Sequence, residues 1–67
     1  MKILLNNNAE EFMENSLTVN ELLQRKNFTF KMLVIKINGR LIKKTEYPTA
    51  TIHEGDEVQV LHLISGG

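Results

Sequence analysis

The clearest structural signal in this chain of 67 residues is the stretch Leu33-Val34-Ile35-Lys36-Ile37-Asn38-Gly39-Arg40-Leu41-Ile42. Its apolar residues at alternate positions, 33, 35 and 37, are typical of a strand with one buried face. Asn38-Gly39 follows directly and is the strongest short hairpin signal, because both central residues of a type I′ turn need positive φ. The stretch therefore predicts a β-hairpin in which residues 40–42 form the short returning strand.

A helix is predicted before this hairpin. Residues 18–21, Thr-Val-Asn-Glu, have the form of a capping box. In that motif the Thr18 hydroxyl accepts from the Glu21 backbone N–H, and the Glu21 carboxylate accepts from the Thr18 N–H. Apolar residues at 19, 22 and 23 then form one stripe at helical spacing. We expect the helix to end near Lys26 and Asn27, where basic residues suit the negative end of its dipole.

Three further strands are predicted from alternation: Met1 to Leu5, a weaker one around Glu11 to Asn15, and the last and clearest, Glu57 to Ile64. Two runs of turn residues bound them, Asn6-Asn7-Asn8 and Glu54-Gly55-Asp56. The pattern from Lys43 to His53 is irregular, and Pro48 argues against a central strand there.

The order of these elements indicates the fold class. It is strand, strand, helix, strand, short strand and strand, and a single sheet must cover the helix because nothing else in the chain can. We predict an α+β fold of the β-grasp (ubiquitin-like) kind, a mixed sheet of four to five strands packed on one helix. Two hairpins separated by a helical crossover place the first and last strands side by side, parallel and central. The domain covers residues 1–64, and residues 65–67 form a flexible C-terminal tail.

Composition limits what so small a domain can do. A single domain of 67 residues has little interior to spare for a deep substrate cavity. The chain contains no cysteine, which excludes disulfides, thiolate metal sites and a cysteine nucleophile. His53 and His62 lack the convergent partners that a metal site or a general base needs. We therefore expect no metal, no cofactor and no catalytic side chain.

The charges are segregated, although the formal net charge is zero. Seven of the eight basic residues lie between Arg25 and Lys44, and no acidic residue falls in that stretch. Such a stretch fits an acidic partner or a solvated set of loops and strand edges. Its aromatic pattern does not favour nucleic-acid binding. The longest wholly apolar run, Met32 to Ile35, is far too short to span a membrane, and the N-terminus lacks a signal-peptide pattern, so we expect a cytoplasmic protein.

Strand parity divides the predicted sheet into two faces. The residues that share a parity with Lys2, Lys36 and Gln59 should point away from the helix. Four apolar residues belong to that set and are expected to cluster beside the tail as a partner-binding face: Leu4, Val34, Leu61 and Leu63. An apolar patch on the open side of a small sheet marks an interaction site, although scattered exposed leucines are also common.

The chain ends in Ser65-Gly66-Gly67. Without Cβ atoms, the last two residues can enter a slot that is too narrow for any other residue type. In an extended conformation, residues 65–67 reach about 10 Å beyond the sheet. A flexible terminus without a role also fits two glycines. The chemical alternative is a tail that delivers its carboxyl group into the active site of another protein.

The grasp-like order, the Asn38-Gly39 hairpin, the Glu54-Gly55-Asp56-Glu57-Val58 turn and the closing Gly66-Gly67 together resemble the ubiquitin-like sulfur carriers. The resemblance is greatest to the ThiS type, the sulfur carriers of thiamine biosynthesis, and covers essentially the whole chain. It implies a carrier, not an enzyme. Gly67 carries the chemistry in this family pattern, Gly66 permits access, and Ser65 is a spacer.

The resemblance also implies three protein partners. An adenylating enzyme uses ATP to activate the terminal carboxylate of Gly67. A persulfide on a sulfur donor protein then converts it to a thiocarboxylate, and thiazole synthase receives the sulfur.

Other branches of the family share the diglycine ending. Small subunits of molybdopterin synthase typically carry a Pro-Pro pair shortly before it, where this chain has Leu61-His62-Leu63-Ile64-Ser65, which favours the thiamine branch. Carriers for tRNA thiolation or cysteine synthesis stay open as alternatives. So do ubiquitin-like attachment to lysines and a β-grasp interaction module without tail chemistry.

Overall fold

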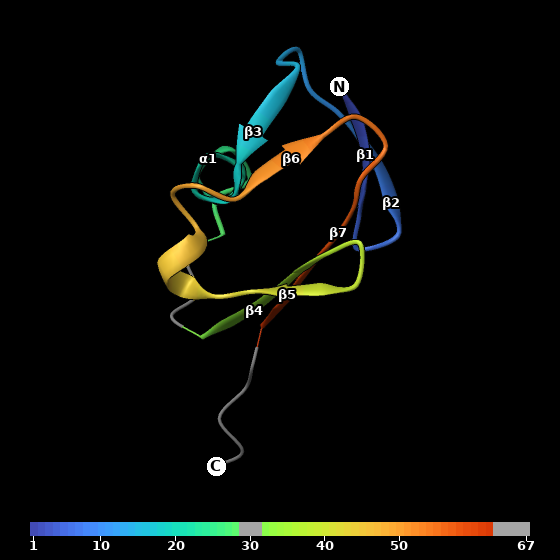
Figure 1. Cartoon of the computed structure of the whole chain (residues 1–67). Coiled ribbons are helices and arrows are strands. Elements are labelled where there is room, and N and C mark those ends of the chain that lie inside the picture. Colours follow the sequence, from blue (N-terminus) through green and yellow to red (C-terminus); the bar gives the residue numbers. More distant parts are fainter. Residues whose placement is uncertain (29–31, 63–67) are drawn as a thin grey trace.

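A computed structural model describes residues 1–28 and 32–62 of the chain. In chain order the elements are β1 (Lys2–Leu5), β2 (Asn8–Glu11), β3 (Ser16–Thr18), α1 (Val19–Arg25), β4 (Leu33–Ile37), β5 (Arg40–Ile42), the 3₁₀-helix η1 (Lys44–Glu46), β6 (Thr51–His53) and β7 (Glu57–His62). Five strands form one mixed sheet in the order β2-β1-β7-β4-β5, and β3 pairs with β6 in a separate two-stranded sheet (Figure 1). The predicted α+β class, with a five-stranded mixed sheet and one helix, is confirmed.

The centre of the sheet is a parallel pair. β1 runs parallel to β7, with Leu4 beside Glu57 and Leu5 beside Val58. β4 is paired along its whole length with β7, antiparallel, from Leu33 opposite His62 to Ile37 opposite Val58. The predicted pairing of the first and last strands is therefore confirmed, and β7 is the middle strand of the five.

The β4–β5 hairpin forms at the predicted place. Asn38 and Gly39 have φ values of 51° and 83°, as a turn of positive φ requires. The Asn38 side chain also ties the turn to the start of β7. Its Oδ1 accepts from the Glu57 backbone N–H at 2.9 Å, and its Nδ2 donates to Asp56 Oδ1 at 3.0 Å.

The second strand lies earlier than predicted. β2 covers Asn8–Glu11, whereas the sequence indicated a strand around residues 11–15. Asn6 and Asn7 both adopt positive φ, 51° and 67°, so two residues complete the turn and pairing resumes at once with Leu5 opposite Asn8. Two asparagines therefore behave as Asn-Gly does, because a short polar side chain tolerates the left-handed region.

The helix begins and ends as predicted. The Glu21 N–H donates to Thr18 Oγ1 at 3.1 Å, and the Thr18 N–H donates to Glu21 Oε1 at 2.8 Å, which completes the capping box. The C-cap is Lys26, and Asn27 follows with a φ of 58°. A left-handed residue just past the last turn is a usual way for a helix to stop.

The β3–β6 pair was not predicted. Leu17 and Ile52 lie opposite each other in it, and both are buried. The irregular region after β5 therefore contains η1 and then β6, and Pro48 lies in the turn between them. Strands of three residues are too short for an alternating pattern to be recognised. Figure 1 shows this pair lying together with α1, above β4 and β5 in the view.

The core lies between the five-stranded sheet and the layer formed by α1, β3 and β6. The buried apolar residues are Ile3, Leu5, Phe12, Leu17, Val19, Leu22, Ile35, Ile42, Ile52, Val58 and Val60. Those in β1, β4 and β7, namely Ile3, Leu5, Ile35, Val58 and Val60, have the parity predicted to face the helix. Within residues 1–28 and 32–62 no charged or polar side chain is buried, so packing alone holds this core together.

Candidate functional site

The end of β7 is the part of the described structure that comes last in the sequence before the predicted tail. β7 stops at His62, which lies opposite Leu33 at the first residue of β4. The predictions for Leu63, for a strand reaching Ile64 and for the tail Ser65-Gly66-Gly67 fall outside the described residues. The last described residue, His62, therefore belongs to the central strand of the sheet.

An asparagine that the sequence indicated only as a turn residue holds β7 in place. β1 ends at Leu5, but the Asn6 side chain continues the ladder beside β7. Its Oδ1 accepts from the Val60 N–H at 2.8 Å, and its Nδ2 donates to the Val60 carbonyl at 3.2 Å. An amide side chain can satisfy both main-chain groups because it carries a donor and an acceptor. β7 is thus hydrogen-bonded at Val60, beyond the end of its parallel neighbour β1 at Leu5.

The outer face of the sheet brings together only part of the predicted partner-binding set. Val34 lies directly opposite Leu61, and Leu61 is 46% exposed. Leu4 also points outward and is 40% exposed, but it lies beside Glu57 at the start of β7. Leu61 lies four positions further along β7, about 13 Å at 3.3 Å per residue. The prediction that Leu4 clusters with Val34 and Leu61 is therefore wrong.

Leu41 belongs to the outer face and was missed. It is the residue of β5 opposite Lys36, and it is 55% exposed. The Asn38-Gly39 turn determines which residues of β4 and β5 are opposite, so strand parity extended to the short returning strand places Leu41 on the outer face.

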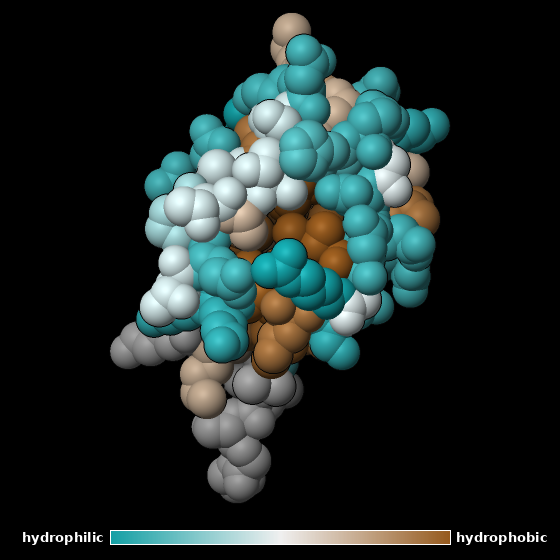
Figure 2. Space-filling model, viewed as in Figure 1, coloured by the Kyte–Doolittle hydropathy of each residue, from teal (hydrophilic) through white to brown (hydrophobic). Residues whose placement is uncertain are grey.

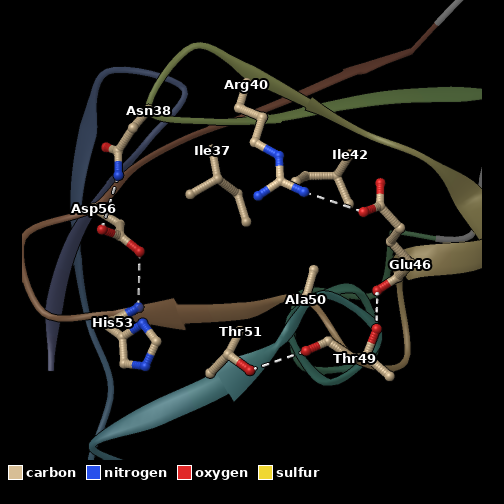
Figure 3. A pocket seen from close by; sticks show the side chains of 10 residues that line it. All are labelled: Ile37, Asn38, Arg40, Ile42, Glu46, Thr49, Ala50, Thr51, His53 and Asp56. Atoms are coloured by element: carbon tan, nitrogen blue, oxygen red, sulfur yellow. Dashed lines mark hydrogen bonds and ion pairs between the residues drawn. The ribbon is translucent and has the colours of Figure 1, made fainter.

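The inner side of the β4–β5 hairpin has an open hollow of about 600 Å³. Figure 2 shows apolar surface at the centre of this side of the molecule, ringed by hydrophilic residues. Ile37, Ile42 and Ala50 supply apolar lining, and the Arg40 side chain reaches toward Glu46 (Figure 3), with 3.2 Å between Nη2 and Oε2. The size of this hollow was not anticipated from the sequence.

Polar groups at the rim of the hollow bond to one another. Asp56 accepts from the Asn38 side chain through Oδ1 and from the His53 backbone N–H through Oδ2, at 3.0 and 2.9 Å (Figure 3). These contacts close the turn before β7. In residues 1–28 and 32–62 no three His, Cys, Asp or Glu side chains gather as a metal site would require. We therefore assign the rim a structural role.

The groups whose pKa values are shifted, Glu14, Arg25 and Tyr47, are not part of β7. The hydrogen bond from Arg25 lowers the pKa of the Glu14 carboxyl, and the same bond raises the pKa of Arg25. Burial raises the pKa of the Tyr47 hydroxyl, because the ionised form loses solvation. These shifts follow from an ion pair and from core packing.

No helix in the described part of the chain is both long enough and apolar enough to cross a lipid bilayer.

Comparisons with known proteins agree with this geometry. The chain resembles the crystal structure of the thiamine biosynthesis protein (ThiS) from Geobacter metallireducens, with a TM-score of 0.90 and 25% sequence identity over 100% of both chains. A search of curated proteins found no match. The profile of the ThiS family matches residues 3–67, nearly the whole sequence. The chain therefore belongs to the ThiS family of ubiquitin-like sulfur carriers.

Proposed function

We propose that this protein carries sulfur for thiamine biosynthesis as a thiocarboxylate on Gly67. The family match carries the proposal, because it extends to residue 67 and so includes the diglycine. The fold supports it, since β7 is the central strand and ends at His62, five residues before Gly67. Residues 1–64 act as the scaffold and residues 65–67 as the tail that enters partner enzymes.

The chemistry begins with a poor electrophile. A carboxylate resists nucleophilic attack, so the adenylating enzyme first joins a Gly67 carboxylate oxygen to the α-phosphorus of ATP and releases pyrophosphate. The terminal sulfur of a protein persulfide then attacks the Gly67 carbonyl carbon and displaces AMP. A thiolate finally attacks the donor-protein sulfur of the resulting acyl disulfide, which frees the thiocarboxylate and leaves a new disulfide on the partner side.

The protein is a cosubstrate in this scheme, not an enzyme. Thiazole synthase takes the sulfur from the Gly67 thiocarboxylate, and the regenerated carboxylate starts a new cycle. The ATP, the nucleophilic thiols and the catalytic groups all belong to partners. We place the cycle in the cytoplasm. Gly66 lets the tail pass through the narrow entrance of each partner, and Ser65 is the spacer.

Intact mass tests the proposal directly. Incubating the protein with the cognate adenylating enzyme, ATP and a persulfide donor should exchange one oxygen for sulfur, a gain of about 16 Da. A variant that lacks Gly67 should show no gain under the same conditions. If the full-length protein keeps its mass with an adenylating enzyme that is shown to be active on another carrier, the interaction-module alternative is correct. Addition of purified thiazole synthase with its other substrates should then return the mass to its starting value.

We also propose that Val34 and Leu61, together with Leu63, contact the adenylating enzyme while the tail is in its active site. Leu61→Asp places a charge in the apolar centre of that contact, and we expect it to weaken binding by about 2 kcal/mol or more, roughly thirtyfold. Isothermal titration calorimetry measures the change. Met13→Asp is the control, since the Met13 side chain is fully exposed and lies outside the sheet. Equal affinities for the two variants would rule out this contact.

A further inference from the structure

The basic stretch between Arg25 and Lys44 is divided by the fold into paired and unpaired residues. Three of its members form ion pairs with acidic residues from elsewhere in the chain: Arg25 with Glu14, Lys26 with Glu10 at 3.0 Å, and Arg40 with Glu46 at 3.2 Å. Among the described residues of the stretch, three lysines form no ion pair: Lys36, Lys43 and Lys44. Their charges are available to a partner.

Two of these lysines lie on the outer face. Lys36 lies on β4, opposite Leu41 of β5 on one side and opposite Gln59 of β7 on the other. Lys43 continues β5 with an extended backbone, φ −77° and ψ 153°. Because Ile42 points inward, the next extended residue points outward, and the antiparallel register places it beside Val34.

The outer face therefore carries an apolar diagonal with a cation on each side. Leu41 on β5 lies diagonally from Val34 on β4, and Leu61 on β7 lies directly opposite Val34. Lys36 and Lys43 lie on the two sides of the diagonal between Leu41 and Val34, because Lys36 is opposite Leu41 and the register places Lys43 opposite Val34. We call these five residues the lysine-flanked patch. Leu41 and Leu61 are about half exposed, so a partner can still bury a large part of both side chains.

The other end of the same face has a net negative charge, with Glu57 and Glu11 against Lys2. Glu57, the first residue of β7, is exposed and shares the outward parity of Leu61. Leu4 and Ala9 lie beside it in β1 and β2, and Glu11 follows at the end of β2 opposite Lys2. Along β7 the outer face thus runs from an acidic start to a basic, apolar end, and residues 63–67 follow that end in the sequence.

From this arrangement we infer that the lysine-flanked patch docks on a protein surface with an apolar centre and carboxylates at its edge, and that Lys36 and Lys43 set the docking orientation. The inference rests on the proposed function and assigns this surface to the adenylating enzyme, beside the entrance that the tail uses. In the reverse orientation Glu57 faces the partner carboxylates, and like charges repel. The two lysines therefore favour the one orientation that directs the tail into the active site.

Charge-reversal variants of neighbouring residues test the inference. Lys43→Glu changes a residue of the patch, whereas Lys44→Glu makes the same change one residue later, in η1. Lys36→Glu and Lys2→Glu form a second matched pair, at opposite ends of the outer face. We expect Lys43→Glu and Lys36→Glu each to raise the KM of the adenylating enzyme for this carrier about tenfold in low salt, with kcat unchanged. The two control variants should stay within about twofold of the unmodified protein.

Salt provides the second readout. The screening length falls from about 10 Å at 0.1 M salt to about 3 Å at 1 M. The KM differences between patch and control variants should therefore shrink as salt rises, whereas a difference caused by lost packing should persist. Thermal unfolding confirms that each variant is folded, and Lys36→Gln replaces Lys36→Glu if the latter is not.

The outcomes separate this inference from the proposed function. A wild-type protein that gains no mass with ATP and the persulfide donor contradicts the proposed function, and the docking inference falls with it. A wild-type protein that gains mass, together with equal KM values for Lys43→Glu and Lys44→Glu at low salt, overturns the docking inference alone.

Discussion

Gly66→Val should stop the protein from being adenylated while leaving it folded. Valine adds a branched Cβ at the position that has to pass through a slot shaped for glycine. A displacement of about 1 Å at a reacting centre costs roughly a hundredfold in rate, so we expect kcat/KM for adenylation to fall at least that far. Pyrophosphate release and intact mass measure the loss, and an unchanged melting temperature shows that the scaffold is intact.

A graded series makes this prediction sharper. Gly66→Ala adds only one methyl group and should lose less activity than Gly66→Val if the entrance excludes side chains by size. Thr45→Val introduces the same side chain at an exposed position in η1, where the threonine hydroxyl makes no hydrogen bond within the described structure, and should behave as the unmodified protein does. Full activity in Gly66→Val would show that the second glycine is dispensable and would remove the steric argument for the tail.

Ile35→Ala should bring the protein close to unfolding. Ile35 has no exposed surface and lies opposite Ile42 and Val60 in the middle of the sheet. Removing so large a buried side chain costs about 2–5 kcal/mol, because the cavity closes only in part. The whole free energy of unfolding for a domain of this size is about 3–10 kcal/mol. Urea denaturation followed by circular dichroism should show a midpoint lower by about 2 M or more.

Leu41→Ala is the matched control for this experiment. Leu41 lies in the neighbouring strand with its side chain on the opposite face, where it is 55% exposed. We expect it to change the free energy of unfolding by no more than about 0.5 kcal/mol. Similar losses in the two variants would mean that the outer face is packed as tightly as the core, contrary to the exposure of Leu41.

Local rules accounted for the turns and the helix. The Asn38-Gly39 turn, the capping box of Thr18 and Glu21 and the Gly55 turn all formed where the sequence indicated, Gly55 with a φ of 85°. Each depends on residues within three positions of one another, so no distant part of the chain is needed to explain it. The pairing of β1 with β7 was also predicted, because two hairpins separated by a helical crossover place the first and last strands side by side.

The predictions that were wrong or missing concern features that depend on which strand residues pair with each other. β2 was placed too late because Asn6-Asn7 was not recognised as a complete two-residue turn. The β3–β6 pair was missed because a strand of three residues is too short to show an alternating pattern, and the pairing joins residues far apart in the sequence, with Leu17 opposite Ile52. Leu4 was grouped with Leu61 because parity indicates which face a residue is on and not its position along the neighbouring strand.

The sequence by itself determined the fold class, the turns at Asn38-Gly39 and Gly55, and the diglycine that we propose as the reactive end, since these follow from backbone preferences and from residue types in fixed order. Only the tertiary structure decided which charges of the basic stretch are neutralised and which surround an apolar patch. The physical reason is that an ion pair depends on how close two charges lie in the folded chain and not on their separation in the sequence. Arg25 meets Glu14 and Arg40 meets Glu46 through the folded chain, while Lys36 and Lys43 come together on one face through the pairing of β4 with β5.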